Sequence, residues 1–387
     1  MPIYRSLSFP ILSLFVLLLA LSPAEAQVVE TGYGRVEFIG LRSWNAARLI
    51  DSLEVLDALR RLETSRELLP GELRSHDSPN VWLYDLEHRF AFPAVVVGAY
   101  SDSTAGIHQI YWVITVIEPT DSAKLWKIAR PVTWNPAPSD PEWAGLDTMY
   151  ERHRGQWELA VRTFGYIASG KVEEGRKVVG AIMEAPINRI QIRGHNVEPI
   201  PSEPEIEQLW LRIAAITRPY QKKYALQVLT ARASDANLYN RIVATAVLAN
   251  FSHDDGVWNA LMSVQLDPWE EVSESALTSL AGLATHLARR IDWTASSEMI
   301  SAILDGNRLE HFTEILDILS ATSISPVLAP FILPGHEELL LAYLAAHHEP
   351  ERASAHRFLV TIAGRDLGND PALWRKWIAG LKGPGGR

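Results

Sequence analysis

The spacing of hydrophobic residues along the first third of the chain is typical of short strands. Residues 36–41 alternate between apolar and polar side chains, and residues 94–100 and 107–117 are β-branched and aromatic runs. Between these two runs, residues 101–106 are small, polar and contain a glycine. Alternation with period two, and apolar runs bounded by turn residues, predict strands. The two runs therefore predict a β-hairpin.

A helical pattern separates the first predicted strand from this hairpin. Leu49, Leu53 and Leu56 recur on one side of residues 45–62, and Ser43 stands where an N-cap residue is expected. A second short helix before the hairpin completes the order strand, helix, helix, strand, strand. This order predicts a small α+β domain over residues 27–118.

A stretch rich in Pro and Trp, residues 119–141, follows the α+β domain and is predicted to be a linker, since Pro is not tolerated inside a helix. Trp126 and Trp134 are expected to pack this linker on its neighbours.

Residues 142–204 are then predicted to be a helical connecting region that ends in further prolines. Beyond it, helical spacing predicts helices at about 205–217, 220–232, 236–251, 254–265, 269–290, 293–304, 308–320, 336–347, 350–363 and 371–381. Such lengths and short loops are typical of stacked helix pairs.

Two of these predicted helices carry similar residues at the same spacing: an Asp, an Ala nine residues later, and an aliphatic residue four after that. The residues are Asp235, Arg241, Ala244 and Leu248 in the first copy, and Asp267, Pro268, Val272, Ala276 and Leu280 in the second. Asp can cap a helix, Pro fits the first helical position, and Ala lets a neighbouring helix approach. We expect Asp267 to cap the second helix, and Arg289 and Arg290 to complement its dipole in the last turn.

This pattern resembles the inner helix of HEAT repeats. A looser copy spans residues 349–363, and Asp370-Pro371 followed by Trp374 and Trp377 looks like the closing segment of bacterial HEAT-repeat proteins. The resemblance covers residues 205–381 and implies HEAT-like helical repeats with a C-terminal cap. The expected fold class is therefore mainly α, a HEAT-like α-solenoid preceded by a small α+β domain. The family includes scaffolds, adaptors and regulators, so the resemblance specifies architecture more than activity.

The element order of residues 27–118 resembles that of a polypeptide-transport-associated (POTRA) domain. Phe38-Ile39-Gly40 ends the first strand of that order, and Val116-Ile117-Glu118 ends the last. POTRA domains bind extended chains by strand addition, so the resemblance implies a polypeptide partner. Unrelated small α+β units share the order, and both interpretations stay open.

The first residues have the three parts of a secretory signal peptide. Arg5 supplies the positive charge, residues 11–21 are a nearly unbroken apolar run, and Ala24-Glu25-Ala26 fits a cleavage site. The run is shorter than the ~20 apolar residues that span a bilayer. We therefore expect a signal peptide over residues 1–26, export to the periplasm or beyond, and no stable membrane insertion after cleavage.

The amino-acid composition limits the kinds of site that the chain can form. The chain has no cysteine, which excludes disulfides, thiol nucleophiles and cysteine-ligated metals, and its net charge of −10 disfavours nucleic acid as a partner. His336, Glu337, His347, His348 and His356 lie close together in sequence, yet they have no metal-site spacing. No nucleophile elbow or phosphate-binding loop is present either. We predict no metal, no cofactor and no catalytic residue.

Thirteen tryptophans offer the remaining candidates for binding, since exposed Trp side chains can stack on sugars or anchor a peptide. Most lie within helical patterns and are expected to be buried, whereas Trp82, Trp126 and Trp134 lie in irregular stretches. The preferred function is a non-enzymatic scaffold or adaptor of the bacterial cell envelope that binds a protein partner on the solenoid surface. The alternative is an envelope hydrolase or sugar-binding protein with a site in the cleft between the two halves.

Overall fold

The computed structural model describes residues 26–32, 34–65, 82–102, 109–126, 241–242, 244–245, 248–287 and 289–381. Several predictions therefore lie outside the described residues: most of the signal peptide, the linker beyond Trp126 with Trp134, the connecting region 142–204, the predicted helices at 205–217 and 220–232, and the start of the helix at 236–251 with Asp235. None of the described helices is long and apolar enough to cross a membrane.

The N-terminal part contains a mixed sheet in the strand order β1-β2-β4-β3. The strands are β1 (Gln27–Thr31), β2 (Gly34–Ile39), β3 (Ala94–Asp102) and β4 (Gln109–Ile117). β2 pairs in parallel with β4, and the other two pairs are antiparallel. The predicted first strand and hairpin are confirmed, whereas β1 was not predicted. It is a five-residue edge strand with half-exposed side chains, so its apolar pattern is weak.

Helices α2 (Ala46–Ser65) and α3 (Trp82–His88) cover one face of this sheet and confirm the predicted order. Ser43 does not cap α2, because Asn45 does so: its Oδ1 accepts from the Arg48 N–H at 3.1 Å. Trp82 is the first residue of α3 and is fully buried, so this candidate for binding is a core side chain.

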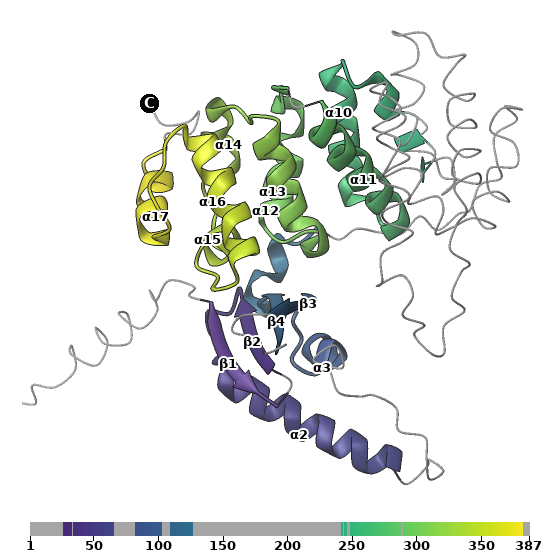
Figure 1. Cartoon of the computed structure of the whole chain (residues 1–387), viewed down its shortest axis with the longest axis vertical. Coiled ribbons are helices and arrows are strands. Elements are labelled where there is room, and N and C mark those ends of the chain that lie inside the picture. Colours follow the sequence, from purple (N-terminus) through teal and green to yellow (C-terminus); the bar gives the residue numbers. More distant parts are fainter. Residues whose placement is uncertain are drawn as a thin grey trace, which may run out of the picture.

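The C-terminal part is an array of helices (Figure 1). Its described α-helices are α10 (Asp255–Ser263), α11 (Glu270–His286), α12 (Ser297–Leu304), α13 (Phe312–Ala321), α14 (Ala329–Ile332), α15 (Glu338–Leu344), α16 (Glu349–Ala363) and α17 (Pro371–Ala379). α13 contacts both α11 and α16, α12 contacts α10 and α14, and α15 contacts α16 and α17. The chain is thus mainly α, with a small N-terminal sheet. Every helix predicted beyond residue 253 is present, all but α16 in shortened form, and among the α-helices described there only the four-residue α14 was missed.

α11 is shorter than the sequence pattern predicted. It ends at His286, and Leu287 leaves the helical conformation with φ −124° and ψ 42°. Arg289 and Arg290 lie beyond this end and do not complement the dipole of α11. Arg289 forms an ion pair with Asp255 at 2.6 Å, and Arg290 donates to the Ser325 hydroxyl at 3.1 Å. Their side chains bind neighbouring helices instead.

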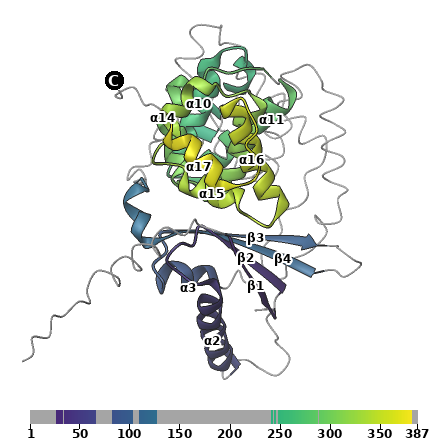
Figure 2. The same ribbon diagram turned by 90° about the vertical axis from the view of Figure 1, so that its left-hand side faces the viewer.

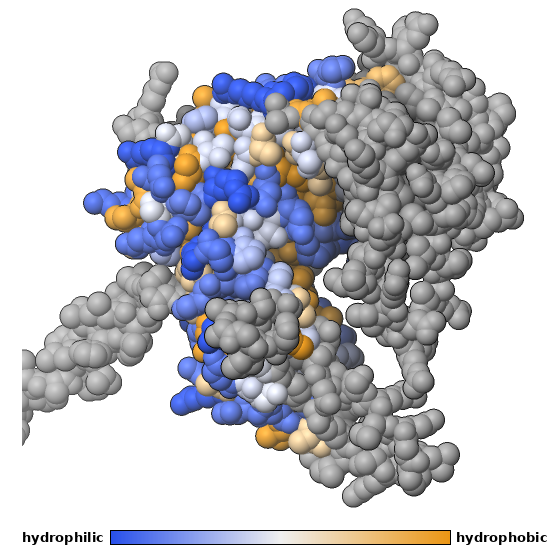
Figure 3. Space-filling view, viewed as in Figure 1, coloured by the Kyte–Doolittle hydropathy of each residue, from blue (hydrophilic) through white to orange (hydrophobic). Residues whose placement is uncertain are grey.

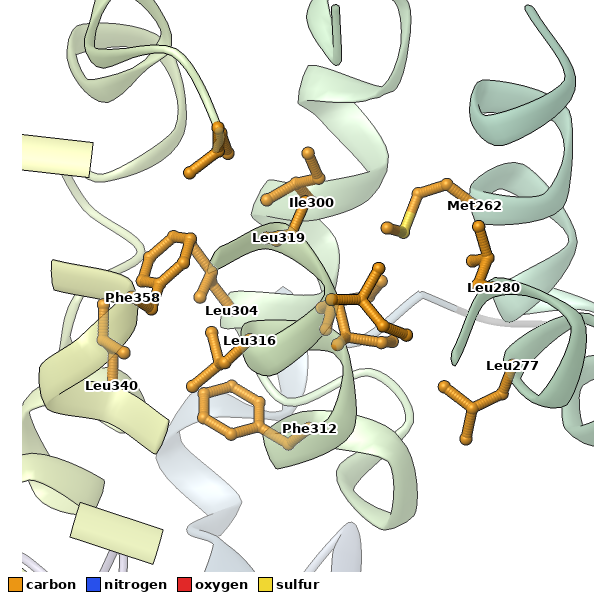
Figure 4. Close-up of a cluster of buried hydrophobic side chains, with 14 of the residues drawn as sticks. Met262, Leu277, Leu280, Ile300, Leu304, Phe312, Leu316, Leu319, Leu340 and Phe358 are labelled. Atoms are coloured by element: carbon orange, nitrogen blue, oxygen red, sulfur yellow. The ribbon is translucent and has the colours of Figure 1, made fainter. Parts of the chain in front are cut away.

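A continuous hydrophobic core connects the helices of the array (Figure 4). Its fully buried side chains include Leu280 of α11, Ile300 of α12, Phe312 and Leu316 of α13, and Phe358 of α16. α13 and α16 contribute side chains mainly from one face, as the amphipathic spacing predicted, whereas α15 is buried on all sides from Leu339 to Leu344. Packing between successive helices, with no disulfide, therefore stabilises this part of the chain.

The sheet packs beneath this array, and α2 and α3 lie on its opposite side (Figure 2). Because side chains alternate along β4, Trp112 and Ile114 face α2 and α3, whereas Tyr111, Val113 and Ile117 join the core of the array. This is why β4 is a nearly unbroken apolar run. We call the contact between sheet and array the seam.

A glycine permits close packing at the seam. Gly306, after α12, has φ +100°, and a Cβ there would lie 2.3 Å from Cδ1 of Ile117 in β4. A larger residue would be strained and would also displace the sheet. The sheet and the helical array are thus closely packed at Gly306.

The described start of the linker also binds the array. Residues Pro119–Lys124 form a 3₁₀ helix, which was not predicted. The Trp126 N–H donates to Asn307 Oδ1 at 2.8 Å, while the Trp126 side chain is 42% exposed. Leu125 packs on the hydrophobic core instead. The side chain that packs this part of the linker on the array is therefore Leu125, and not Trp126 as predicted.

Candidate functional site

The residues predicted to form the repeat are mostly buried between helices. Ala244, Leu248, Val272, Ala276 and Leu280 are each fully buried. They face the core of the array and are not available to a ligand. Their role in the structure is packing.

Asp267 and Pro268 do not start α11. Trp269 is the N-cap residue, so Pro268 is not in the first helical position. Asp267 Oδ1 accepts from the Trp269 N–H at 2.9 Å, and Oδ2 forms an ion pair at 3.4 Å with Arg241 of the helical segment that precedes α10. Burial raises the pKa of the Asp267 carboxyl, against the opposing effects of this N–H and of Arg241 and Arg308. Asp267 thus connects the start of α11 to the segment of Arg241, the two places where the sequence predicted a repeat.

The predicted cap residues lie together at the far end of the array. Asp370 Oδ1 accepts from the Ala372 N–H at 2.8 Å, so Asp370 caps α17. Trp374 is fully buried and donates its indole N–H to the Gly368 carbonyl at 2.6 Å. Trp377 meets Trp374 edge to face, at 5.7 Å between ring centroids, and is only half buried. α17 therefore covers its neighbours while keeping an open side of its own.

A buried carboxylate that the sequence analysis missed joins the sheet to the array. Glu37 of β2 is fully buried. It accepts from the N–H groups of His347 at 2.5 Å and His348 at 2.9 Å, just before α16, and from the Tyr111 hydroxyl at 2.8 Å. An acidic residue on the same strand face as buried Ile39 was the one sequence signal for this role.

Glu351 of α16 is the second carboxylate of the same cluster. It accepts from the Tyr100 hydroxyl at 2.6 Å and contacts His348 Nδ1. The His348 ring lies 4.1 Å from the Tyr100 ring and 5.0 Å from the Tyr111 ring, between centroids. Burial, and hydrogen bonds to the two carboxylates, raise the pKa of both tyrosines. The polar atoms of this cluster therefore bind one another rather than a ligand.

The cavity at the other end of the seam is too small for a sugar. It measures about 30 Å³ and is lined by Gly40, Glu118, Asp305, His336 and Leu339, among others. A water molecule needs ~10–15 Å³ of such space, so the cavity holds about two waters. Asp305 Oδ2 contacts His336 Nδ1 at 2.8 Å, and within the described part of the chain Oδ1 has no hydrogen-bond partner. This cavity is therefore too small to be the sugar or substrate site of the alternative function.

The histidines that suggested a metal site are spread over separate contacts. His336 pairs with Asp305, His348 with Glu351, and His356 with Asp366. Among the described residues, no group of three or more His, Asp or Glu side chains has the arrangement of a metal site. Each histidine is bound to a neighbouring carboxylate instead.

Two larger grooves open at the surface near α17. The first, which we call the C-terminal groove, measures about 430 Å³ and is lined mainly by Arg365, Leu367, Leu373, Lys376, Trp377 and Leu381. The second, of about 420 Å³, lies between Ala26 and the helices, with His347, Arg352 and Asp370 among its polar groups. Those groups already contact Glu37, Glu349 and the start of α17. The C-terminal groove is thus the better candidate binding site.

We compared the chain with known protein families, curated proteins and solved structures. No family model matches the sequence, and neither the curated proteins nor the solved structures contain a significant match. The candidate function therefore rests on the contacts described above.

Proposed function

We propose that the chain is a non-enzymatic interaction scaffold or adaptor of the bacterial cell envelope, built as a HEAT-like α-solenoid on a small α+β domain. It binds a polypeptide partner on the surface of the helical array. The observation that carries the proposal is the C-terminal groove, an open and largely apolar surface at the end of a packed array. Stacked helix pairs present long surfaces of this kind to other proteins.

The start of the sheet supports the export part of this proposal. β1 begins at Gln27, the first residue after the proposed cleavage site. Gln27 donates from its side chain to the Trp44 carbonyl at 3.0 Å and accepts from the Ala46 N–H at 2.8 Å. A chain that begins at Gln27 would therefore keep its first strand anchored to α2. The POTRA-like interpretation belongs to the same proposal and implies a second binding surface along a sheet edge.

The buried polar groups of the seam favour a scaffold over an enzyme cleft. A catalytic acid or base must reach a substrate from a pocket, whereas Glu37 and Glu118 accept from backbone N–H groups inside the fold. These carboxylates hold loops and the start of a helix in place.

The test is retention of envelope polypeptides by the immobilised mature chain. The full mature chain is needed, since the sheet shares a core with the array and neither part is established as folding alone. We expect one or a few polypeptides to be retained with saturable affinity and identified by mass spectrometry. If none is retained, while a glycan fraction raises the melting temperature, the alternative of a sugar-binding protein or hydrolase takes its place.

A further inference from the structure

The C-terminal groove combines apolar walls with cationic edges. Leu373 is 49% exposed, and Leu367, Trp377 and Leu381 are half buried beside it. Arg365 and Lys376 are exposed and also line the groove. Figure 3 shows hydrophobic and strongly hydrophilic residues side by side at this end of the array. Its volume of about 430 Å³ is within the range of ligand sites.

The cations of the groove lack carboxylate partners among the described residues. Arg365 and Lys376 form no ion pair there, whereas other charges nearby are paired: Asp366 binds His356, and Arg375 binds Glu338. Asp366 also accepts from the Gly368 N–H at 2.7 Å. The whole chain carries a net charge of −10, so an apolar groove lined by cations and by no carboxylate stands out from its surroundings.

We propose that this groove binds an acidic peptide segment of the partner protein, with large apolar side chains on Leu373 and Trp377 and carboxylates near Arg365 and Lys376. The inference rests on the proposed function and names the chemistry of its partner. Apolar contact at the centre with complementary charge at the rim is the usual arrangement of peptide sites. A membrane surface fits less well, because basic clusters that bind anionic lipid have about 4–8 Lys or Arg side chains.

The test uses the mature chain and a pair of short fluorescent peptides. One peptide carries Leu and Phe among Glu residues, and its twin has Lys in place of every Glu. Fluorescence anisotropy should show saturable binding of the acidic peptide and at least tenfold weaker binding of its twin. Both Leu373→Ser and Lys376→Glu should weaken binding of the acidic peptide about tenfold, and Lys376→Glu should improve binding of the twin. A tenfold change corresponds to about 1.4 kcal/mol.

The matched control is Phe331→Ser on α14, a side chain that is 51% exposed and does not line the groove. It should leave the binding of both peptides unchanged. Equal binding of the two peptides, or full binding by Leu373→Ser, would overturn the inference.

Two other occupants would also overturn it. Self-association of the wild type that Leu373→Ser abolishes, measured by analytical ultracentrifugation, would assign the groove to a second copy of the chain. Binding to vesicles of anionic lipid that the same variant abolishes would assign it to a membrane. If Leu373→Ser retains the same envelope polypeptides as the wild type, the proposed function stands and only the groove assignment fails. If the wild type retains none, the proposed function itself fails.

Discussion

The helical array meets two different surroundings at its sheet side and at its C-terminal end. On the sheet side, Ile39 and Ile117 complete the hydrophobic core, and Glu37 occupies the N–H groups that precede α16. At the C-terminal end, Leu373 is half exposed and Lys376 has no carboxylate partner among the described residues. On the sheet side, the apolar and polar groups of the array are covered by the sheet. At the C-terminal end, apolar area and positive charge remain exposed to solvent.

The contrast between the two surfaces indicates where a partner can bind. At the seam, a ligand would have to displace buried hydrogen bonds, each of which costs ~1–3 kcal/mol when left unmade. At the C-terminal groove, a ligand would cover apolar area that water now contacts, which stabilises the complex. Binding is therefore expected at the open end, while the seam maintains the shape.

The largest predicted effect lies beneath the C-terminal groove. Trp374→Ala should lower the free energy of unfolding by about 3–5 kcal/mol, because it removes a fully buried indole that packs in the core. Trp377→Ala should cost clearly less, since this side chain is only half buried. Urea denaturation of the two variants measures both values. Equal losses would mean that α17 does not bury one side and expose the other.

The next effect concerns the seam. Glu37→Ala would leave the His347 and His348 N–H groups and the Tyr111 hydroxyl without their acceptor, and should cost about 3 kcal/mol in the same assay. Glu30→Ala is the matched control on the neighbouring strand. Its carboxylate is 67% exposed and pairs with Arg35, so its loss should change stability by less than about 1 kcal/mol. A Glu37 variant as stable as the control would show that the seam is not held by this carboxylate.

A smaller effect is expected where the start of α11 meets the helical segment of Arg241. Asp267→Ala removes the acceptor of the Trp269 N–H and leaves the buried Arg241 guanidinium without this carboxylate, which should cost about 2 kcal/mol. Asp267→Asn keeps an acceptor for the Trp269 N–H and should cost less. If the two variants lose the same stability in urea melts, the Trp269 hydrogen bond contributes nothing measurable.

The smallest effect is the dependence of seam stability on alkaline pH. The pKa of Tyr100 and of Tyr111 is raised above the ordinary value of 10.0 by burial and by hydrogen bonds to Glu351 and Glu37. Both hydroxyls have a higher pKa in the folded chain than in the unfolded chain. Their contribution to the free energy of unfolding is therefore complete below pH 10 and is lost as the pH rises through the folded-state pKa. The double variant Tyr100→Phe, Tyr111→Phe should therefore lose less stability between about pH 10 and 11 than the wild type. Parallel curves for the two proteins would contradict a role for these hydroxyls.

Local patterns in the sequence predicted the elements better than the contacts between them. Amphipathic spacing and the Asp370-Pro371 start were sufficient to place α17, and the apolar run of β4 was sufficient to place a strand. Helix ends were less predictable, because Asn45 and not Ser43 caps α2, and α11 begins after Trp269. Several polar side chains near an element can serve as its cap, and the choice depends on tertiary neighbours.

The seam and the C-terminal groove could not be predicted from local patterns. Glu37 binds the N–H of His347, which lies 310 residues away along the chain, and no local pattern reports such a pairing. The groove depends on how the loop around Leu367 packs beside Trp377 and Leu381, which leaves Leu373 exposed. Leu373 has the same apolar character as a core residue, so only the packed structure distinguishes the two.

The most direct test of a polypeptide-binding C-terminal groove is photo-cross-linking in living cells. The full-length protein, expressed in its own cells, would carry a photoreactive amino acid in place of Leu373 or, as the control, in place of the exposed Phe331. We expect a discrete polypeptide adduct from position 373 that is absent from position 331 and is reduced by Lys376→Glu. Adducts of equal intensity from both positions, or none from position 373, would contradict it.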